Sequence, residues 1–264
     1  MFEFEQNVIQ LFESHNIKIE YCADDHYLLS ESLNIIFINN STQQDFEVID
    51  NLSAKTIKTI RLWEDEYLNH RQIIDSRILS LLGISSRIYA RETIVKTISK
   101  VELENFLLTN HLNVPIAAKH RYGLFYNRSG AEELVAVAAF SRSCPIQDKG
   151  ITYKSHELIR YCSLLNTTVV GGLSKLISHF EQDKNPEHIM TYVDREWSDG
   201  KTYIKLGFSV IDKTPPQEFW LSPKDNERLP ANRLPKNLLL SNLQEDGWSR
   251  INNLGNIKLV KFLK

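Results

Sequence analysis

The chain has 264 residues, of which 42% are hydrophobic, and a formal net charge of −2. This length is enough for one large or two small domains, and the charge excludes a strongly basic nucleic-acid binder while leaving a local basic face compatible with DNA binding. The three cysteines lack metal-ligand spacing, no apolar run approaches membrane-spanning length, and no signal peptide opens the chain, so a cytoplasmic location is expected.

Residues 1–87 are predicted to form a small α/β module. Apolar residues at helical spacing indicate an amphipathic first helix, and a nearly all-apolar run indicates a buried strand. Gly83 is expected to end the last helix. The predicted elements are a helix over 2–15, strands over 17–22, 33–38 and 56–63, and a helix over 64–82.

Residues 88–264 are predicted to form a second domain with a C-terminal extension. Ser99, with Glu102 three residues later, indicates a capping box at a helix start. Ser129 and Gly130 mark a hairpin turn. The predicted elements are strand 88–98, helix 100–110, strands 122–126, 134–141 and 157–165, helix 173–182, strand 188–193, helix 198–206, and strands 208–211 and 218–221.

Residues 203–208 read Tyr-Ile-Lys-Leu-Gly-Phe. This ending, together with the order of the predicted elements, resembles the GNAT acyltransferases. The resemblance implies an α/β (α+β) fold with a GNAT-like mixed sheet flanked by helices, in which the strands at Glu157 and His188 are parallel and splayed at one end. It also implies that Tyr203 protonates a leaving thiolate, as a phenol can. The alternative is that Tyr203 is a core aromatic, as we expect for Phe208.

A predicted strand runs into a glycine pair at the start of a helix, where unpaired N–H groups and the helix dipole favour an anion. In GNAT enzymes this turn holds the pyrophosphate of coenzyme A, so the resemblance implies acetyl-CoA or a related acyl-CoA as cofactor. Thr168 and Leu173 depart from the usual Gln/Arg-x-x-Gly-x-Gly/Ala motif. Close packing of the helix through its glycines is the alternative. The candidate cofactor-binding residues are Thr168, Gly171, Gly172, Ser174 and Lys175.

Three short blocks resemble the phage Mom family across residues 99–221: Asn110-His111, residues 157–160 and residues 192–194. Mom proteins are GNAT-like enzymes that place a carbamoylmethyl-type group on adenine in DNA. The resemblance implies a transferase that acts on a nucleic-acid base, with DNA as its expected partner and RNA as an alternative.

One cleft at the splayed strand ends is expected to hold the catalytic residues His111, Asp194 and Tyr203. His111 or Asp194 would remove a proton from the attacking nitrogen, and Tyr203 would return one. The alternatives are an ordinary polar role for His111 and a buried ion pair between Glu157 and Arg160. The candidate substrate-binding residues, which include aromatics for stacking on a base, are Glu157, Arg160, Tyr192, Arg195 and Trp197.

Nearly the whole chain resembles phage and mobile-element proteins identified as very-short-patch-repair-like homing endonucleases, through blocks such as 62–66, 169–172 and 247–251. Such nucleases use an acidic cluster to bind Mg²⁺. Glu5 is a candidate for one acid, but Asn34 stands where the family has Asp, and an amide is a poor Mg²⁺ ligand. Residues 1–87 are therefore predicted to be a degenerate PD-(D/E)XK-like module that holds no metal and serves in DNA docking or as structure.

Three functions follow from these resemblances. The leading hypothesis is a Mom-like GNAT-fold transferase of phage or mobile-element origin that acts on a nucleic-acid base. The alternatives are a non-catalytic DNA-binding remnant of a homing endonuclease and a small-molecule N-acetyltransferase. The basic stretch 228–236 is expected to be a DNA-contacting arm or a solvated loop.

Overall fold

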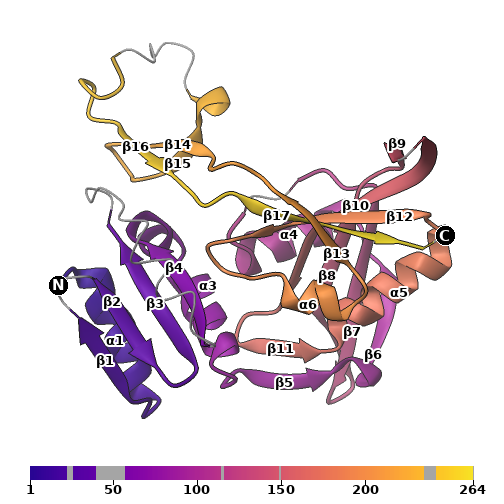
Figure 1. The fold of residues 1–264 in the computed structure, drawn as a ribbon. Helices are drawn as coiled ribbons and strands as arrows, with labels where there is room; N and C mark the ends of the chain where they lie inside the picture. The colour runs from indigo at the N-terminus through magenta and orange to yellow at the C-terminus, as the bar shows by residue number, and fades with distance from the viewer. Residues whose placement is uncertain (23–25, 40–56, 114–115, 149, 235–241, 264) are drawn as a thin grey trace. The chain divides into compact units, whose positions relative to one another are not determined.

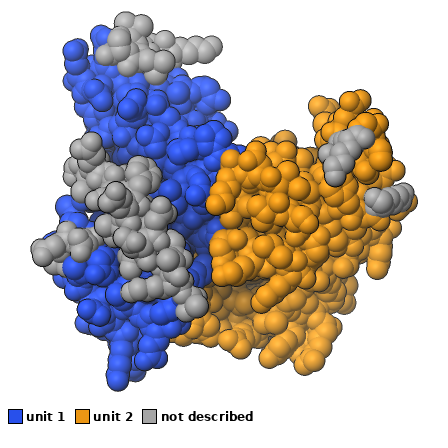
Figure 2. Space-filling view, in the orientation of Figure 1, with its two compact units in different colours: residues 1–75, 194–198, 214–256 blue, residues 76–193, 199–213, 257–264 orange. Residues whose placement is uncertain are grey.

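The computed structural model describes residues 1–22, 26–39, 57–113, 116–148, 150–234 and 242–263. Two compact units divide the chain, each built from segments that are distant in the sequence (Figure 2). Unit 1 comprises residues 1–75, 194–198 and 214–256, and unit 2 comprises residues 76–193, 199–213 and 257–264. The division into domains 1–87 and 88–264 stays a prediction, since these units follow contacts and not sequence order.

Unit 1 contains a four-stranded sheet in the order β1-β2-β3-β4, in which β3 and β4 are parallel and the other pairs antiparallel (Figure 1). Phe4, Val8 and Phe12 form the buried face of α1, as the helical spacing predicts. The strand between β1 and β3 is absent from the sequence-based prediction. The elements are α1 (Glu3–Ser14), β1 (Ile19–Cys22), β2 (Tyr27–Ser30), β3 (Leu33–Ile38), β4 (Lys58–Trp63) and the start of α3 (Glu64–Leu81).

A three-stranded sheet, β15-β14-β16, completes unit 1 and consists of β15 (Arg228–Pro230), β14 (Glu218–Leu221) and β16 (Ser249–Asn252). The expectation that the strand over 218–221 finishes the mixed sheet of the predicted second domain is wrong, because β14 pairs with β15 and β16. Leu221 instead packs with Ile251 in a cluster that includes the apolar side chains of β3 and β4.

Unit 2 contains the mixed sheet, in the order β13-β17-β12-β10-β8-β7-β6, with β9 paired to β10. Helices pack on both faces of this sheet, so the fold class predicted from the sequence is confirmed (Figure 1). The strand β17, which the sequence did not suggest, takes the place expected for β14. The strands are β6 (Thr93–Thr97), β7 (His120–Arg128), β8 (Ala131–Phe140), β9 (Cys144–Asp148), β10 (Ile151–Ser163), β12 (His188–Asp194), β13 (Ser209–Lys213) and β17 (Asn256–Phe262).

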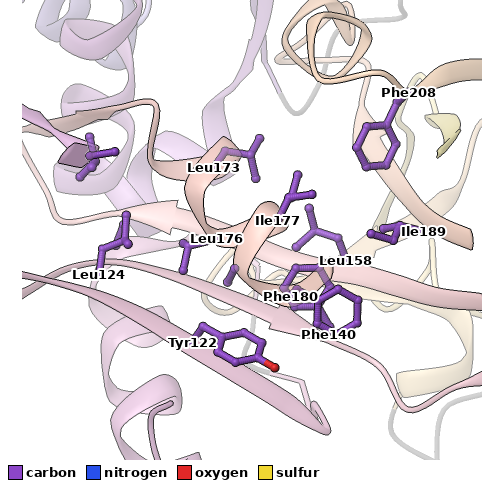
Figure 3. Packing of buried hydrophobic residues seen from close by; sticks show 14 of the residues in the cluster. Tyr122, Leu124, Phe140, Leu158, Leu173, Leu176, Ile177, Phe180, Ile189 and Phe208 are labelled. Carbon is purple, nitrogen blue, oxygen red and sulfur yellow. The ribbon is translucent and has the colours of Figure 1, made fainter. Parts of the chain in front are cut away.

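Two helices lie on opposite faces of this sheet. Neighbouring residues of β8 alternate between two apolar clusters, as side chains on a strand must. Ala138 belongs to the cluster of α5 (Gly172–Lys184), where Phe140 and Phe180 stack with ring centroids 3.9 Å apart (Figure 3). Ala139 belongs to the cluster of α4 (Lys100–Asn110). The predicted capping box of α4 is confirmed, because the Ser99 hydroxyl accepts from the Glu102 N–H at 3.1 Å.

The predicted strand over 88–98 is two strands. A 3-10 turn, η1 (Ala90–Glu92), separates β5 (Ser86–Tyr89) from β6. The predicted strand over 157–165 ends at Ser163, and β11 (Thr167–Val170) begins after Asn166, whose φ of 57° turns the chain. Parallel pairing joins β5 and β11 in a separate two-stranded sheet. The short helix α6 (Lys201–Lys205) lies within its predicted range. Among the described residues, no helix is long and apolar enough to cross a membrane.

Candidate functional site

The parallel strands β10 and β12 pair over only three positions and then part. The paired positions run from Ser155 with His188 to Glu157 with Met190, although both strands continue beyond them. Immediately after the last pair, the Thr191 hydroxyl donates to the Leu158 carbonyl at 2.9 Å. A side chain therefore satisfies a carbonyl that a continuous ladder would bond to backbone. The predicted parallel and splayed strands are both present.

A β-bulge sets which side chains of β10 face α4. Register shifts against β8 between Leu158 and Arg160, so Ile159 is the extra residue. Without this bulge, Glu157 and Arg160 would lie on opposite faces. With it, both share the face of Cys162, which packs with the α4 cluster.

Glu157 and Arg160 interact electrostatically without a direct ion pair among the described contacts. Burial raises the pKa of the Glu157 carboxyl, and the Arg160 charge opposes that shift. The Arg160 Nη1 donates to the Ile159 carbonyl at 2.8 Å, while its Nε is buried and has no hydrogen-bond partner in the described part of the chain. Arg160 thus presents an unused donor.

His111 follows the last residue of α4. Its Nδ1 accepts from the Asn113 N–H at 2.9 Å, so in the neutral ring the proton lies on Nε2. Burial, with the charges of Arg77 and Arg160, lowers the pKa of His111 to about 3. The ring is therefore neutral at pH 7, and its remaining nitrogen is a hydrogen-bond donor. This geometry suits a donor role better than the base role predicted from the sequence.

Tyr203 belongs to α6 and packs beside the α5 cluster, with its ring edge-on to Phe208 at 5.7 Å between centroids. Burial raises the pKa of its phenol, against smaller opposing effects of the Thr191 hydroxyl and the Arg77 charge. The phenol is therefore protonated at neutral pH. The Thr191 hydroxyl, which also donates to the Leu158 carbonyl, lies at the point where β10 and β12 part. His111 and Tyr203 thus belong to opposite faces of the sheet.

Arg77, in the part of α3 that belongs to unit 2, was not among the residues predicted from the sequence. Its charge lowers the pKa of His111, of Tyr203 and of the Cys162 thiol, whose burial nevertheless raises its pKa to about 12. The charge of Arg77 therefore acts on groups on both faces of the sheet. The sequence carries no signal for it, because a single arginine in an amphipathic helix is normally a surface residue.

The start of α5 has the backbone conformation of an anion-binding turn. Gly171 has a φ of 80°, which glycine adopts without strain. In the first turn, the N–H groups of Gly172 and Ser174 have no partner within the described ranges, as expected for a helix start. The Leu173 N–H bonds the Tyr161 hydroxyl. A side chain at position 172 would come within 3.0 Å of that hydroxyl, so the second glycine also permits close packing.

Two of the predicted cofactor-binding side chains are engaged within the protein. The Thr168 hydroxyl lies between those of Ser80 and Ser85, at 2.7 and 2.6 Å. The Lys175 ammonium donates to the Ala90 carbonyl at 2.8 Å and also to that of Thr93. Any anion at this helix start would therefore be held by backbone groups.

Three residues predicted for the same site lie in unit 1. The Asp194 carboxylate accepts from the Glu196 N–H at 2.9 Å, and an Arg195 guanidinium N–H donates to the Leu254 carbonyl. Trp197 is 1% exposed and cannot stack on a base as it stands, whereas Tyr192, in unit 2, is 40% exposed.

Glu196 organises a buried ionic cluster in unit 1 that the sequence did not suggest. Its carboxylate accepts from Trp63 Nε1 at 2.6 Å, from the Leu254 N–H at 2.9 Å and from Arg61 Nη1 at 3.2 Å. Burial still raises its pKa. The partners come from distant segments, so sequence spacing could not reveal them.

The acid predicted to serve a nuclease is engaged in the N-terminal module. Glu5 is fully buried and accepts from the Phe2 N–H at 2.7 Å and the Tyr21 hydroxyl at 2.8 Å, with His26 Nδ1 at 2.7 Å. Among the described residues, no three His, Cys, Asp or Glu side chains are grouped to hold a metal. Arg228, expected in a basic arm, is instead 15% exposed and pairs with Asp65; residues 235 and 236 lie outside the described residues.

No family model matches the chain, and no curated protein matches it. Solved structures are similar to part of it, and three of them are described next. A histone acetyltransferase HPA2 and related acetyltransferase from Corynebacterium glutamicum shares 13% identity over 64% of this chain and 96% of its own, with a TM-score of 0.38. An acetyltransferase from Bacillus subtilis in complex with CoA shares 13% identity over 65% of this chain and 99% of its own, with a TM-score of 0.38. A chain of the KacTA–DNA complex shares 15% identity over 53% of this chain and 94% of its own, with a TM-score of 0.34.

Proposed function

We propose that unit 2 is a GNAT-like group transferase that uses an acyl-CoA donor. The observation that carries this proposal is the parting of β10 and β12 at Thr191, whose hydroxyl also acts on the pKa of the Tyr203 phenol. A parallel pair that opens at its carboxyl ends is where α/β sheets bind ligands. The family is proposed from the order of the elements along the chain and from the parallel pairing of β10 and β12, both of which the resemblance implies.

The start of α5 fits the backbone part of a donor site. The N–H groups of Gly172 and Ser174, at the positive end of the helix, would hold a pyrophosphate. Bound there, coenzyme A would supply an activated thioester. Thr168 and Lys175 stay in their internal contacts, so the site needs no cationic side chain on α5.

Tyr203 is the residue that would move a proton. Its burial keeps the phenol protonated, so that it can donate to a departing thiolate. His111, on the opposite face of the sheet, has a low pKa and is a weak base, so its Nε2–H serves only as a hydrogen-bond donor there. Asp194, predicted as a base from the sequence, belongs to unit 1 and takes no part in this proposal.

The charges of unit 2 favour an anionic acceptor. Arg77 and Arg160 both act on His111, and burial shifts the carboxyl of Glu157 towards its neutral form. A polycationic acceptor would meet repulsion there, whereas a phosphate-bearing one would be attracted. A nucleic-acid base, with DNA as partner, satisfies this condition, and the exposed ring of Tyr192 is available for stacking. A small N-acetyl acceptor that carries an acidic group is the second candidate.

The test is mass spectrometry of nucleosides from cells that express the wild-type chain or its Tyr203→Phe variant. A modified base present with the wild type and strongly reduced in the variant is expected. Unchanged nucleosides together with an acylated acidic metabolite would favour the second candidate. The absence of both products would contradict the assignment of a transferase.

A further inference from the structure

The parallel pair β3–β4 in unit 1 carries polar side chains whose hydrogen-bonding groups are unused. Asn34 and Thr59 are register partners, so their side chains point to the same face, and Arg61 follows two residues later on that face. The buried atoms without a hydrogen-bond partner, within the described ranges, are Asn34 Oδ1 and Nδ2, Thr59 Oγ1, and Arg61 Nε and Nη2. Asn34 is 1% exposed and Arg61 is 2% exposed.

Such a row is unusual in a folded protein, because buried polar groups are almost always hydrogen-bonded. Thr59 and Arg61 are adjacent on one face of one strand, about 7 Å apart at Cα. The remaining side chains of this face, Ile36, Ile38 and Trp63, pack in an apolar cluster. The unused groups are therefore concentrated at one end of the face and not spread through the unit.

Arg228, in the same unit, shows which kind of group the free edge of Arg61 can bind. The Nε and Nη2 of Arg228 donate two parallel hydrogen bonds to the Asp65 carboxylate, at 2.9 and 2.8 Å. Arg61 contributes only Nη1, to Glu196, so its Nε–Nη2 edge is unpaired. That edge matches two oxygens of a carboxylate or phosphate. Both guanidinium groups also lie over Trp63, at 5.5 Å for Arg61 and 4.9 Å for Arg228.

We propose that Arg61, Thr59 and Asn34 form a binding site for a single phosphate group. Two oxygens would meet the Arg61 edge and a third would accept from the Thr59 hydroxyl or the Asn34 amide. A planar carboxylate would satisfy the guanidinium edge alone, whereas a tetrahedral oxyanion reaches the neighbouring donors as well. The site belongs to unit 1 and is independent of the transferase proposed for unit 2.

Charges of both signs surround Arg61, and Glu66 pairs with Arg228. Glu196 and Asp194 act on it from one side, and Arg195 and Arg228 act with the same sign as Arg61 itself. Asp65 is taken up by Arg228. An incoming phosphate would bond to Arg61 in a buried setting, where a charge-assisted bond is strong.

Titration of the intact protein with inorganic phosphate, against sodium chloride of equal ionic strength, tests the site by calorimetry and by thermal denaturation. Saturable binding that raises Tm is expected. Thr59→Val keeps the shape of the side chain, and we expect it to fold and to bind phosphate about tenfold more weakly. Arg61→Lys keeps the charge near Glu196 but loses the two-donor edge, and the same loss is expected.

Arg71→Gln is the matched control, because it removes an exposed arginine of the same unit that pairs with Asp75 and lies over the Tyr67 ring, away from Arg61 in the sequence. Phosphate binding should be unchanged in it. An oligonucleotide without terminal phosphates that competes with inorganic phosphate identifies backbone phosphodiesters as the source, and failure to compete identifies a free or terminal phosphate. The absence of saturable binding to the wild type overturns the proposal. So does a Thr59→Val variant that is more stable and responds to phosphate like the wild type, since the atoms then hold only internal water.

Discussion

The two units each contain a parallel strand pair in their main sheet, and the pairs differ in how far they run together. In unit 1, β3 and β4 pair over all six positions from Leu33 with Lys58 to Ile38 with Trp63. In unit 2, β10 and β12 pair over three positions and then part. The face of β3 and β4 that carries Arg61 is covered by an apolar cluster, so Arg61 must find buried partners. A parted ladder leaves backbone groups for side chains such as Thr191, and opens the sheet to a ligand.

The largest effect on stability is expected from substitution of Glu196, in the buried ionic cluster of unit 1. Glu196→Ala would leave Arg61, the Trp63 indole N–H and the Leu254 N–H without their acceptor. Loss of one partner of a buried pair costs about 3–5 kcal/mol, to be measured as the free energy of unfolding in urea. Glu196→Gln retains an acceptor and should cost clearly less. Equal stability of the alanine variant and the wild type would mean that the cluster contributes nothing.

The next largest effect is expected on the rate of group transfer in unit 2, where β10 and β12 part. Tyr203→Phe removes one hydroxyl while keeping the ring contact with Phe208. We expect the rate of group transfer to fall about 100-fold, in the range of general-acid catalysis, with little change in thermal stability. Single-turnover kinetics with acetyl-CoA measures the rate. Tyr89→Phe is the control, since its ring is 43% exposed and belongs to β5, outside this core. A fully active Tyr203→Phe variant would make Tyr203 a packing residue.

A smaller effect tests how tightly α5 approaches β10. Gly172→Ala would bring a Cβ to 3.0 Å from both the Tyr161 hydroxyl and Val169. Overpacking of this kind costs about 1–3 kcal/mol, measured by chemical denaturation. Adding Tyr161→Phe should recover part of the loss. If the single variant is as stable as the wild type, the helix start is looser than described and the glycine serves another purpose.

The smallest effects are two opposite dependences of stability on pH. The folded-state pKa of His111 is lowered from 6.5 to about 3, so between those values the unfolded chain binds a proton that the folded chain does not. Stability should therefore fall as pH decreases through that window. Burial raises the pKa of Glu66 from 4.5 to about 7 despite the nearby Arg228 charge. There the folded chain binds the extra proton, and stability should fall as pH increases from 4.5 to 7.

Because the windows overlap, the variants separate them. His111→Gln should remove a loss of about 1–2 kcal/mol on the acid side, and Glu66→Gln a similar loss towards neutral pH, once solvent screening is considered. The measurement is the free energy of unfolding from pH 4 to 7.5. Superimposable pH profiles for the wild type and both variants would show that neither group is shifted.

Local patterns were sufficient to predict most elements. The alternation and spacing of apolar residues located α1, β3 and α5, and the Ser99–Glu102 pair located the start of α4. The destination of β14 could not be predicted in this way, because its apolar side chains suit either sheet. The choice depends on Ile251 and on β17, both far along the chain.

The candidate site was predictable only where one segment carries it. Residues 203–208 and the glycine pair marked Tyr203 and the start of α5. The bulge at Ile159 and the charge of Arg77 depend on β8 and α3, so no spacing within one segment encodes them. The same is true of Glu196, whose partners come from β4 and from position 254.

Hydrogen exchange of the intact protein with and without coenzyme A tests the central claim most directly. If the parted strands of unit 2 hold the donor, coenzyme A should bind and slow exchange in peptides covering 158–163, 171–175 and 191–193. Peptides covering β3 and β4 should be unaffected. Absence of binding, or protection confined to unit 1, would contradict the assignment of a transferase site to the place where β10 and β12 part.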